Sequence, residues 1–276
     1  MEWLDALILG IVQGLSEYLP ISSSGHLEIF REILGINLPN EDILEFDVML
    51  HAATVLSTLV VLWNEFFPLC RSFFTIKRDD NFYYVCKILI SCIPVAIVGL
   101  FFKDTVESFF GGNLTTVGIC LCITAALLAF AYFFRTKPEE TNKLTGRVYR
   151  PRDITWLDAF VIGIAQSIAV LPGLSRSGTT IATGILLGDK REKVASFSFL
   201  MVIIPILGET LLNIKDMLSE PSASGSVGML PLTIGFIASF VVGCLACKWM
   251  LNIVKKGKLV WFAVYCVIMG IICICW

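Results

Sequence analysis

The chain contains two stretches of nearly the same pattern, LGIVQGLSEYLPISSSGH at residues 9–26 and IGIAQSIAVLPGLSRSGT at residues 162–179. Each runs from a short apolar segment through a Leu-Pro pair into a hydroxyl-rich turn with a glycine. Gln13 of the first stretch aligns with Gln166 of the second, and both copies keep two serines and the glycine of the turn. The charged residues differ, because only the first copy has Glu17 and His26 and only the second has Arg176. A repeated scaffold with unlike polar residues predicts two half-sites that form one site together.

The composition is that of an integral membrane protein. Of the 276 residues, 56% are hydrophobic and only 16% are charged, whereas a soluble domain has about 25% charged residues. A helix crosses a bilayer with about 20 predominantly apolar residues. The chain has six segments of about this length: Phe46–Trp63, Phe82–Phe102, Leu114–Phe134, Val194–Leu212, Met229–Met250 and Leu259–Trp276.

The basic residues lie in alternate loops. Lysine and arginine are concentrated in residues 64–81, 135–153, 190–193 and 248–258, whereas loops 35–45, 103–113 and 213–228 contain only Lys103 and Lys215. By the positive-inside rule, the first set of loops is cytoplasmic. The first repeated stretch then enters and leaves on the outer face, and the second enters and leaves on the inner face. The apolar segment Ile154–Leu171 is long enough to cross the membrane by itself. A full span there, in place of a re-entrant helix, is therefore the alternative for the second stretch.

We therefore expect an all-α polytopic membrane protein that forms a single integral membrane domain over residues 1–276. It is predicted to contain two inverted repeats, 1–135 and 153–276, joined by a basic cytoplasmic loop at 136–152. Each repeat is a re-entrant helix-turn-helix followed by three transmembrane helices, which makes six full spans and about ten helices in all. Inverted repeats with interrupted helices place binding sites near the membrane midplane. Irregular backbone at that depth must be buried in protein or line a cavity, so we expect both turns to line a polar pocket.

The two turns carry groups that bind phosphate. Pro20 and Pro172 each end a short helix, and the serines of 22–24 and 175–177 can cap the helix that follows. A helix N-terminus is a ready anion site, and Arg176 adds a planar fork for bidentate phosphate binding. The alternative is that the serines are only caps and the arginine reaches the membrane surface. The presence of two copies favours anion binding.

Glu17 is an ionisable residue in a predicted membrane interior, where such groups are costly and usually functional. Gln13 lies one helical turn earlier, so the two side chains share a face if the helix reaches Glu17. Together they can give oxygen ligands to Mg²⁺ or Ca²⁺. A structural ion pair between Glu17 and Arg176 is the alternative, and it is compatible with a pyrophosphate site.

Histidine occurs twice in the chain. His26 follows Ser23 by three residues, so the two are neighbours on a helix, and an imidazole there can act as general acid or base. His51 lies in the first predicted span without comparable neighbours, and we interpret it as a packing or supporting residue.

The runs QGLSEYLPISSSGH (13–26) and PGLSRSGTT (172–180) resemble the two signature motifs of the undecaprenyl-diphosphatases, the bacitracin-resistance type of polyprenyl-pyrophosphate phosphatase. The resemblance extends over essentially the whole chain. It implies that the family's Glu/Gln-x-x-x-Glu element is Gln13 and Glu17, its serine Ser23, its histidine His26 and its arginine Arg176. Five further hydroxyl groups of the motifs are then substrate-binding: Ser22, Ser24, Ser175, Ser177 and Thr180. Many members have glutamate in place of Gln13, which makes this residue a weaker metal ligand.

The resemblance also implies a function. It is the hydrolysis of undecaprenyl or another polyprenyl diphosphate to the monophosphate and inorganic phosphate, with a divalent cation (Mg²⁺ or Ca²⁺). This reaction recycles the lipid carrier for peptidoglycan synthesis and confers bacitracin resistance. The expected location is the bacterial plasma (inner) membrane, in many passes, with the active site open to the outer face.

Several alternatives stay open from the sequence. The attacking group is Ser23 assisted by His26, a metal-activated water, or His26 itself. The expected partners are the polyprenyl diphosphate substrate and membrane lipids, with no nucleic acid and with a homodimer left open. A polyprenyl-phosphate flippase or transporter is the alternative function, because inverted repeats with interrupted helices are common in transporters.

Overall fold

The computed structural model describes residues 1–102, 114–134, 151–219 and 227–276, and these residues form helices and no strand. The first half contains α1 (Trp3–Ser16), α2 (Ser23–Leu34), α3 (Asn40–Val61), α4 (Trp63–Phe74), α5 (Asp80–Phe101) and α7 (Leu114–Phe134). The second half contains α8 (Trp156–Ile168), α9 (Arg176–Leu187), α10 (Arg191–Met201), α11 (Ile203–Ser219), α12 (Met229–Lys255) and α13 (Val260–Cys275). The protein is an all-α polytopic membrane protein, as predicted.

Five segments of the described residues are long and apolar enough to cross a membrane: Asp42–Val61, Asp80–Phe101, Leu114–Phe134, Arg191–Leu212 and Met229–Lys255. They correspond to the first five of the six predicted spans. The sixth, predicted at Leu259–Trp276, contains the shorter apolar helix α13 of 16 residues. The fourth is interrupted at Val202, where α10 ends and α11 begins. The joining loop predicted at 136–152 lies almost wholly outside the described residues, so the boundaries of the repeats stay a prediction.

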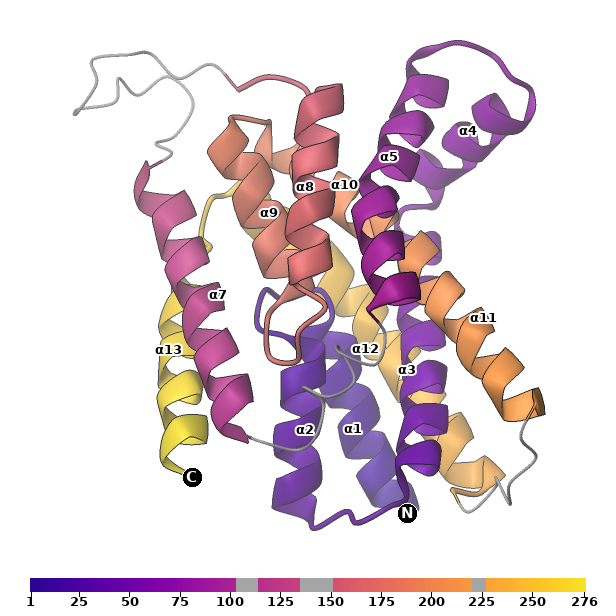
Figure 1. The fold of residues 1–276 in the computed structure, drawn as a ribbon, viewed down its shortest axis with the longest axis vertical. Coiled ribbons are helices and arrows are strands. Elements are labelled where there is room, and N and C mark those ends of the chain that lie inside the picture. The colour runs from indigo at the N-terminus through magenta and orange to yellow at the C-terminus, as the bar shows by residue number, and fades with distance from the viewer. Residues whose placement is uncertain (103–113, 135–150, 220–226) are drawn as a thin grey trace.

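The two repeated stretches form helix pairs that enter from opposite ends of the molecule. Figure 1 shows α1 and α2 at one end and α8 and α9 at the other, with the turn of each pair in the middle. These helices have 14, 12, 13 and 12 residues. The longest is about 21 Å, which is too short for a hydrocarbon core of about 30 Å. The segment Ile154–Leu171 is therefore no span, because α8 ends at Ile168 and the chain turns back into α9.

Each first helix of a pair packs closely on a long helix of the other half, α1 on α12 and α8 on α5. Both contacts involve a glycine, and the two glycines occupy the same position in the two repeated stretches. A Cβ on Gly10 would lie 2.5 Å from the carbonyl oxygen of Gly235, and a Cβ on Gly163 would lie 2.3 Å from that of Ser91. The backbones approach closely only because these positions lack side chains, as is common where membrane helices pack. Because a short helix of each half packs on a long helix of the other half, both turns are held in fixed positions.

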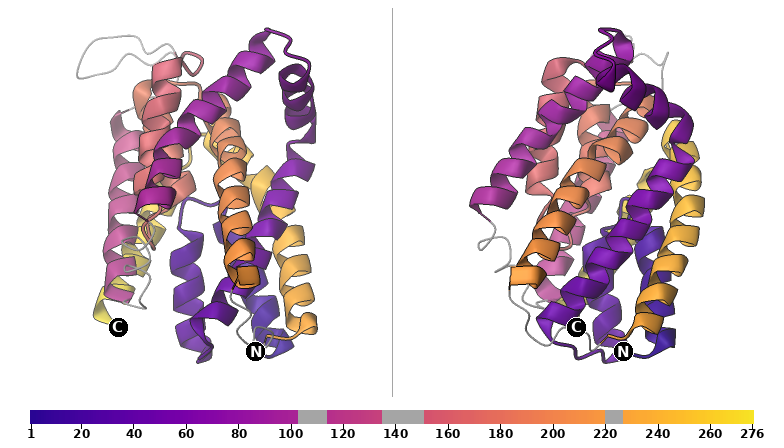
Figure 2. Two further views of the ribbon diagram at one scale, coloured as in Figure 1. Left: turned by 45° about the vertical axis from the view of Figure 1, so that its right-hand side comes forward. Right: turned by 90° about the vertical axis from the view of Figure 1, so that its right-hand side faces the viewer.

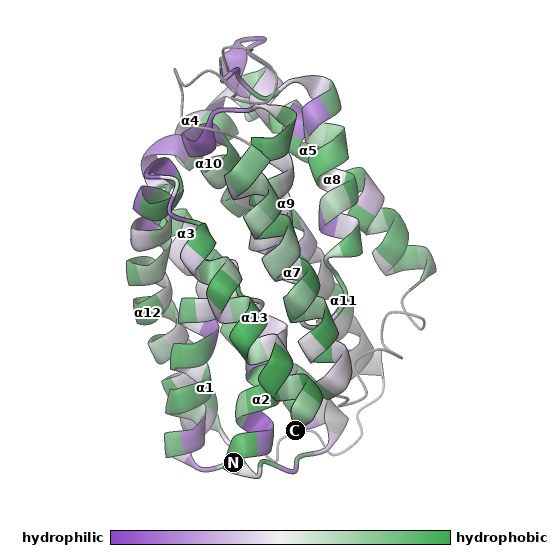
Figure 3. Ribbon diagram, turned by 90° about the vertical axis from the view of Figure 1, so that its left-hand side faces the viewer, coloured by the Kyte–Doolittle hydropathy of each residue, from purple (hydrophilic) through white to green (hydrophobic). Residues whose placement is uncertain are grey.

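The helices are mostly hydrophobic along the length of the bundle, and hydrophilic residues are concentrated toward its ends (Figure 3). Large exposed side chains such as Leu100, Phe133 and Leu245 face outward, with exposed fractions of 66, 69 and 67%. In a soluble protein such a surface would promote aggregation, whereas in a bilayer it faces lipid. The termini lie at the same end of the bundle, the end from which α1 and α2 enter (Figure 2).

Candidate active site

The turns of the two helix pairs are in direct contact. Ser177 Oγ donates a hydrogen bond to the carbonyl oxygen of Leu19 in the opposite turn, at 3.2 Å. A Cβ on Gly25 would lie 3.0 Å from the Cα of Gly173, and a Cβ on Gly178 would lie 3.1 Å from the Cβ of Pro20. The absence of a side chain at each glycine therefore leaves room for the other turn. The structure brings the two predicted half-sites together.

The serines at the starts of α2 and α9 act as caps. Ser22 Oγ accepts from the backbone N–H of Gly25 at 3.3 Å, and Ser175 Oγ accepts from that of Gly178 at 3.0 Å. Ser22 has φ 72°, a left-handed conformation that few residues other than glycine adopt. Such strained positions are found most often at functional sites.

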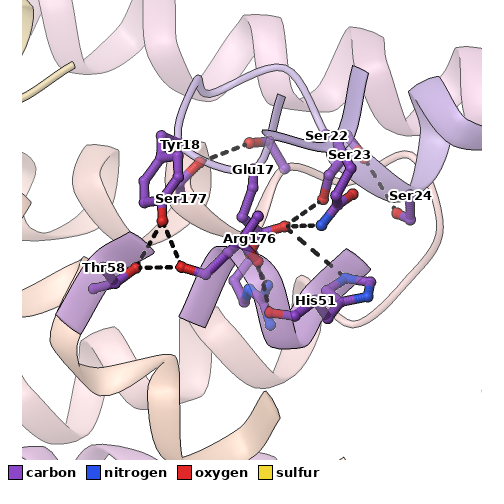
Figure 4. A network of polar contacts seen from close by, with 12 residues as sticks. Glu17, Tyr18, Ser22, Ser23, Ser24, His51, Thr58, Arg176 and Ser177 are labelled. Atoms are coloured by element: carbon purple, nitrogen blue, oxygen red, sulfur yellow. Dashed lines mark hydrogen bonds and ion pairs between the residues drawn. The ribbon is translucent and has the colours of Figure 1, made fainter. Parts of the chain in front are cut away.

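Glu17, at the end of α1, is the centre of the polar cluster in Figure 4. Its side chain is only 7% exposed, and its Oε1 atom accepts from the guanidinium of Arg176 across the two halves. Its Oε2 atom accepts from Ser23 Oγ at 2.7 Å and from Gln13 Nε2 at 3.1 Å. One buried carboxylate thus contacts the predicted arginine, the predicted serine and the predicted glutamine.

The other predicted hydroxyl groups lie around this cluster with different partners. Ser24 Oγ is 3.4 Å from Ser22 Oγ, and Ser177 Oγ is 3.4 Å from Ser175 Oγ. Thr180 Oγ1 donates to the carbonyl of Arg176 at 2.8 Å and lies 2.6 Å from Ser198 Oγ. Thr180 therefore supports the start of α9.

His26 is buried at 3% exposure and does not face the cluster. Its Nδ1 is 2.8 Å from the carbonyl oxygen of Ser22, and its Nε2 is 2.7 Å from the hydroxyl of Tyr265 on α13. Because a carbonyl only accepts, Nδ1 carries the proton and Nε2 accepts from the tyrosine. The expected contact of His26 with Ser23 is therefore not formed, since both ring nitrogens have other partners.

Sequence reasoning missed two neighbours of the cluster. His51 of α3 has its Nε2 atom 4.0 Å from Glu17 Oε2. Tyr18 donates to the carbonyl of Thr54 at 2.6 Å and contacts Ser57 and Thr58, which ties the turn to α3. The signal for His51 was available, because it is an ionisable residue in the predicted membrane interior, as Glu17 is.

A narrow pocket lies beside Glu17 and Arg176, with lining residues from α3, α10 and α11. Figure 2 shows α3 and α11 side by side along the bundle. The lining of the pocket is part polar and part apolar. Its polar lining is Glu17, Tyr18, Thr54, Thr58, Arg176, Ser177 and Ser198, and its apolar lining is Val55, Phe199, Val202 and Ile206.

The cluster has the groups to hold one divalent cation together with a phosphate. Within the described ranges, no three His, Cys, Asp or Glu side chains are close enough to bind a metal by themselves. Mg²⁺ is commonly bound by one or two carboxylates plus substrate phosphates and water, so one carboxylate suffices when a substrate contributes. The fully buried Gln13 also leaves its Oε1 atom without a hydrogen-bond partner, which is an oxygen available for a ligand. The residues present therefore fit such an ion.

The family described as bacitracin resistance protein BacA matches residues 6–272. Undecaprenyl-diphosphatases of Bacteroides fragilis and Parabacteroides distasonis are each 54% identical over 274 residues, which is 99% of this chain and 98% of theirs. An undecaprenyl-diphosphatase of Carboxydothermus hydrogenoformans is 36% identical over 271 residues, which is 98% of this chain and 96% of that protein.

Proposed function

The chain belongs to the bacitracin resistance protein BacA family, and we propose that it hydrolyses undecaprenyl or another polyprenyl diphosphate to the monophosphate and inorganic phosphate. The observation that carries this proposal is the cluster of Glu17, Arg176 and Ser23, of which Glu17 and Arg176 line a pocket that also has apolar lining residues. A diphosphate headgroup suits the polar lining residues. A prenyl chain suits the apolar lining residues, and in this proposal it leaves between α3 and α11 into the bilayer.

Arg176 binds the diphosphate in this mechanism. Its side chain is 25% exposed and reaches the pocket, so its guanidinium can exchange part of its contact with Glu17 for phosphate oxygens. The N-terminus of α9 begins at this same residue and adds the positive end of a helix dipole. Together they stabilise the charge that develops on the phosphate groups during transfer.

Ser23 is the nucleophile that we propose, with Glu17 as its base. Ser23 Oγ already donates to Glu17 Oε2, so the carboxylate can take the proton as Oγ bonds to the terminal phosphorus. The bond from that phosphorus to the bridging oxygen breaks, and the polyprenyl monophosphate leaves as an anion held by Arg176. Water then attacks the phosphoserine. Glu17 returns its proton to Ser23 Oγ as the bond from Oγ to phosphorus breaks, takes a proton from the water, and passes that proton to solvent as inorganic phosphate leaves.

Gln13 and Glu17 are the residues of the first motif that would hold the divalent cation, Mg²⁺ or Ca²⁺. When bound, the cation neutralises phosphate charge and orients the substrate. His26 has a positioning role in this proposal. It fixes the strained turn at Ser22, one residue before the nucleophile, through its contacts with that turn and with Tyr265.

The proposed location is the bacterial inner membrane, with the pocket accessible from the outer face. The positive-inside rule supports this orientation, because the loops that flank α1 and α2 are poor in lysine and arginine. Hydrolysis there would recycle the lipid carrier for peptidoglycan synthesis and cell-wall biogenesis. It would also remove the diphosphate that bacitracin binds, which is consistent with the family's description.

The test is phosphate release from a polyprenyl diphosphate by purified protein in detergent, with Ser23→Ala beside Ser167→Ala as a matched serine control outside the site. Wild type and Ser167→Ala should release phosphate, and a rapidly quenched wild-type reaction with labelled substrate should contain acid-stable phosphoserine. Full activity of Ser23→Ala would exclude covalent serine catalysis. Movement of the lipid between leaflets without phosphate release by wild type would favour the transporter.

A further inference from the structure

His51 is an imidazole at the polar cluster for which the mechanism above has no use. It lies on α3 with 24% of its side chain exposed, and its Nε2 atom is 4.0 Å from Glu17 Oε2 (Figure 4). This separation is longer than a hydrogen bond, which ends near 3.2 Å. It is short enough for one metal ion, with ligand distances of about 2.0–2.2 Å, to touch both atoms.

The ring of His51 is held with its Nε2 lone pair toward Glu17. Its Nδ1 atom is 2.8 Å from the carbonyl oxygen of Asp47, one helical turn earlier, so Nδ1 carries the proton. A backbone carbonyl partner on one nitrogen is the usual arrangement that orients a metal-binding histidine. His26 has a carbonyl partner at Nδ1 as well, but its Nε2 accepts from Tyr265 and its ring is almost fully buried. Of the two histidines, only His51 offers a nitrogen ligand to the cluster.

A second observation also points to a ligand. Gln13 has no exposed surface, and its Oε1 atom has no hydrogen-bond partner while its Nε2 donates to Glu17 Oε2. A buried amide oxygen without a partner is costly, because it has lost its hydrogen bonds to water without replacing them. Turning the amide over does not help the protein alone, because Oε1 would then face the carboxylate at about the same distance. With a cation bound to Glu17, the turned amide would instead place Oε1 toward the ion, which gives that oxygen a partner.

We propose that His51 Nε2 is a direct ligand of the divalent cation, beside Glu17 Oε2 and with Gln13 Oε1 as the weaker third ligand. This proposal rests on the proposed function for the remaining ligands, which are phosphate oxygens and water. It also explains how the chain works with Gln13 where many members of the resembled family have glutamate. The imidazole supplies the strong second ligand that a neutral amide cannot.

A set of one nitrogen and two oxygens differs from an all-oxygen set in its metal preference. Oxygen ligands suit Mg²⁺, Ca²⁺ and Mn²⁺, whereas imidazole suits transition ions, and of these three ions only Mn²⁺ is a transition ion. The site is therefore expected to bind Mn²⁺ more tightly than Mg²⁺. Replacing His51 by glutamine should weaken Mn²⁺ binding by at least about tenfold, the lower effect seen even for residues that only orient a ligand.

The experiment is pulsed electron paramagnetic resonance of Mn²⁺ bound to the tag-free protein in detergent, with inorganic pyrophosphate as the probe for the substrate's phosphates. Echo modulation from a directly bound nitrogen is expected in wild type. The chain has two histidines, so His51→Gln and His26→Gln form a matched pair. The modulation should disappear in His51→Gln and persist in His26→Gln, and the unfolding midpoint without metal shows that each variant is folded. His51→Ala provides a second removal of the ligand if His51→Gln unfolds.

Two results overturn the proposal. The first is Mn²⁺ bound to wild type without nitrogen modulation, as expected if His51 is only a protonated ion-pair partner of Glu17. The second is nitrogen modulation that persists in the variants without His51. Phosphate release is measured on the same wild-type sample. If the wild type hydrolyses the substrate but shows no nitrogen ligand, the proposed function stands and the His51 ligand is rejected. If it shows the nitrogen ligand but does not hydrolyse the substrate, the metal site stands and the proposed phosphatase activity is rejected.

Discussion

The ion pair between Glu17 and Arg176 joins the two halves of the chain, and its removal should affect stability and activity in different ways. Glu17 is 7% exposed, so Arg176→Gln leaves a carboxylate buried without its cation. Breaking a buried pair in this way costs about 3–5 kcal/mol. Because the side chain of Arg176 is 25% exposed and water reaches this edge of the pair, we expect about 3 kcal/mol.

The double variant Glu17→Gln/Arg176→Gln should recover most of this loss. It removes both charges and leaves two amides that can bond to each other, and neutral replacements of buried pairs are often close to neutral in stability. The free energy of unfolding is measured by denaturant titration in mixed detergent micelles for wild type, both single variants and the double variant. Phosphate release is measured on the same samples. The double variant should be more stable than Arg176→Gln and equally inactive. Loss of stability equal to the sum of the single effects would refute the pairing across the halves.

Three further predictions concern packing, the buried histidine and pH. Gly163→Ala places a methyl group against the backbone of α5 and should cost about 1–3 kcal/mol of unfolding free energy, whereas Gly99→Ala, with open space around it, should cost nothing; equal effects would contradict the close packing. Tyr265→Phe removes the hydroxyl that the histidine of α2 contacts and should cost about 1–3 kcal/mol, with kcat falling more than KM changes. An unchanged unfolding curve would sink that role. Burial and the nearby Asp158 raise the pKa of Asp189 to about 7. The fold therefore favours the protonated acid, and the stability of the wild type falls as pH rises from about 4 to 7. Asp189→Asn cannot titrate, so its stability relative to wild type should increase over that range in a pH series of melting curves. A difference independent of pH would be the contrary result.

The long helices could be predicted from the sequence because their signal is local. The span predicted at Leu114–Phe134 has the bounds of α7, and a run of apolar residues of that length has few other solutions. The interruption at Val202 was missed because the apolar run continues through it. Its signal is Pro205, which lacks an N–H group and whose ring clashes with the carbonyl four residues earlier, so α11 begins anew with the proline in its first turn.

The site was predictable where both copies of the motif repeat and less so where other helices contribute. The contact between Glu17 and Arg176 follows from two turns that meet in the middle of the bundle. The surroundings of His26 could not be predicted in this way, because Tyr265 lies 239 residues away and no local spacing encodes that contact. His51 reaches Glu17 only through the packing of α1 on α3, which depends on tertiary structure.

The central claim is that the two turns form one hydrolytic site. Its most direct test is the release of inorganic phosphate from a polyprenyl diphosphate by purified wild type and by Arg176→Ala, side by side, with Mg²⁺ or Mn²⁺ present. The account predicts release by wild type and a fall of at least about 100-fold in kcat for the variant, the usual cost of losing one group that stabilises transition-state charge. Absence of release by wild type, or equal release by Arg176→Ala, would contradict it.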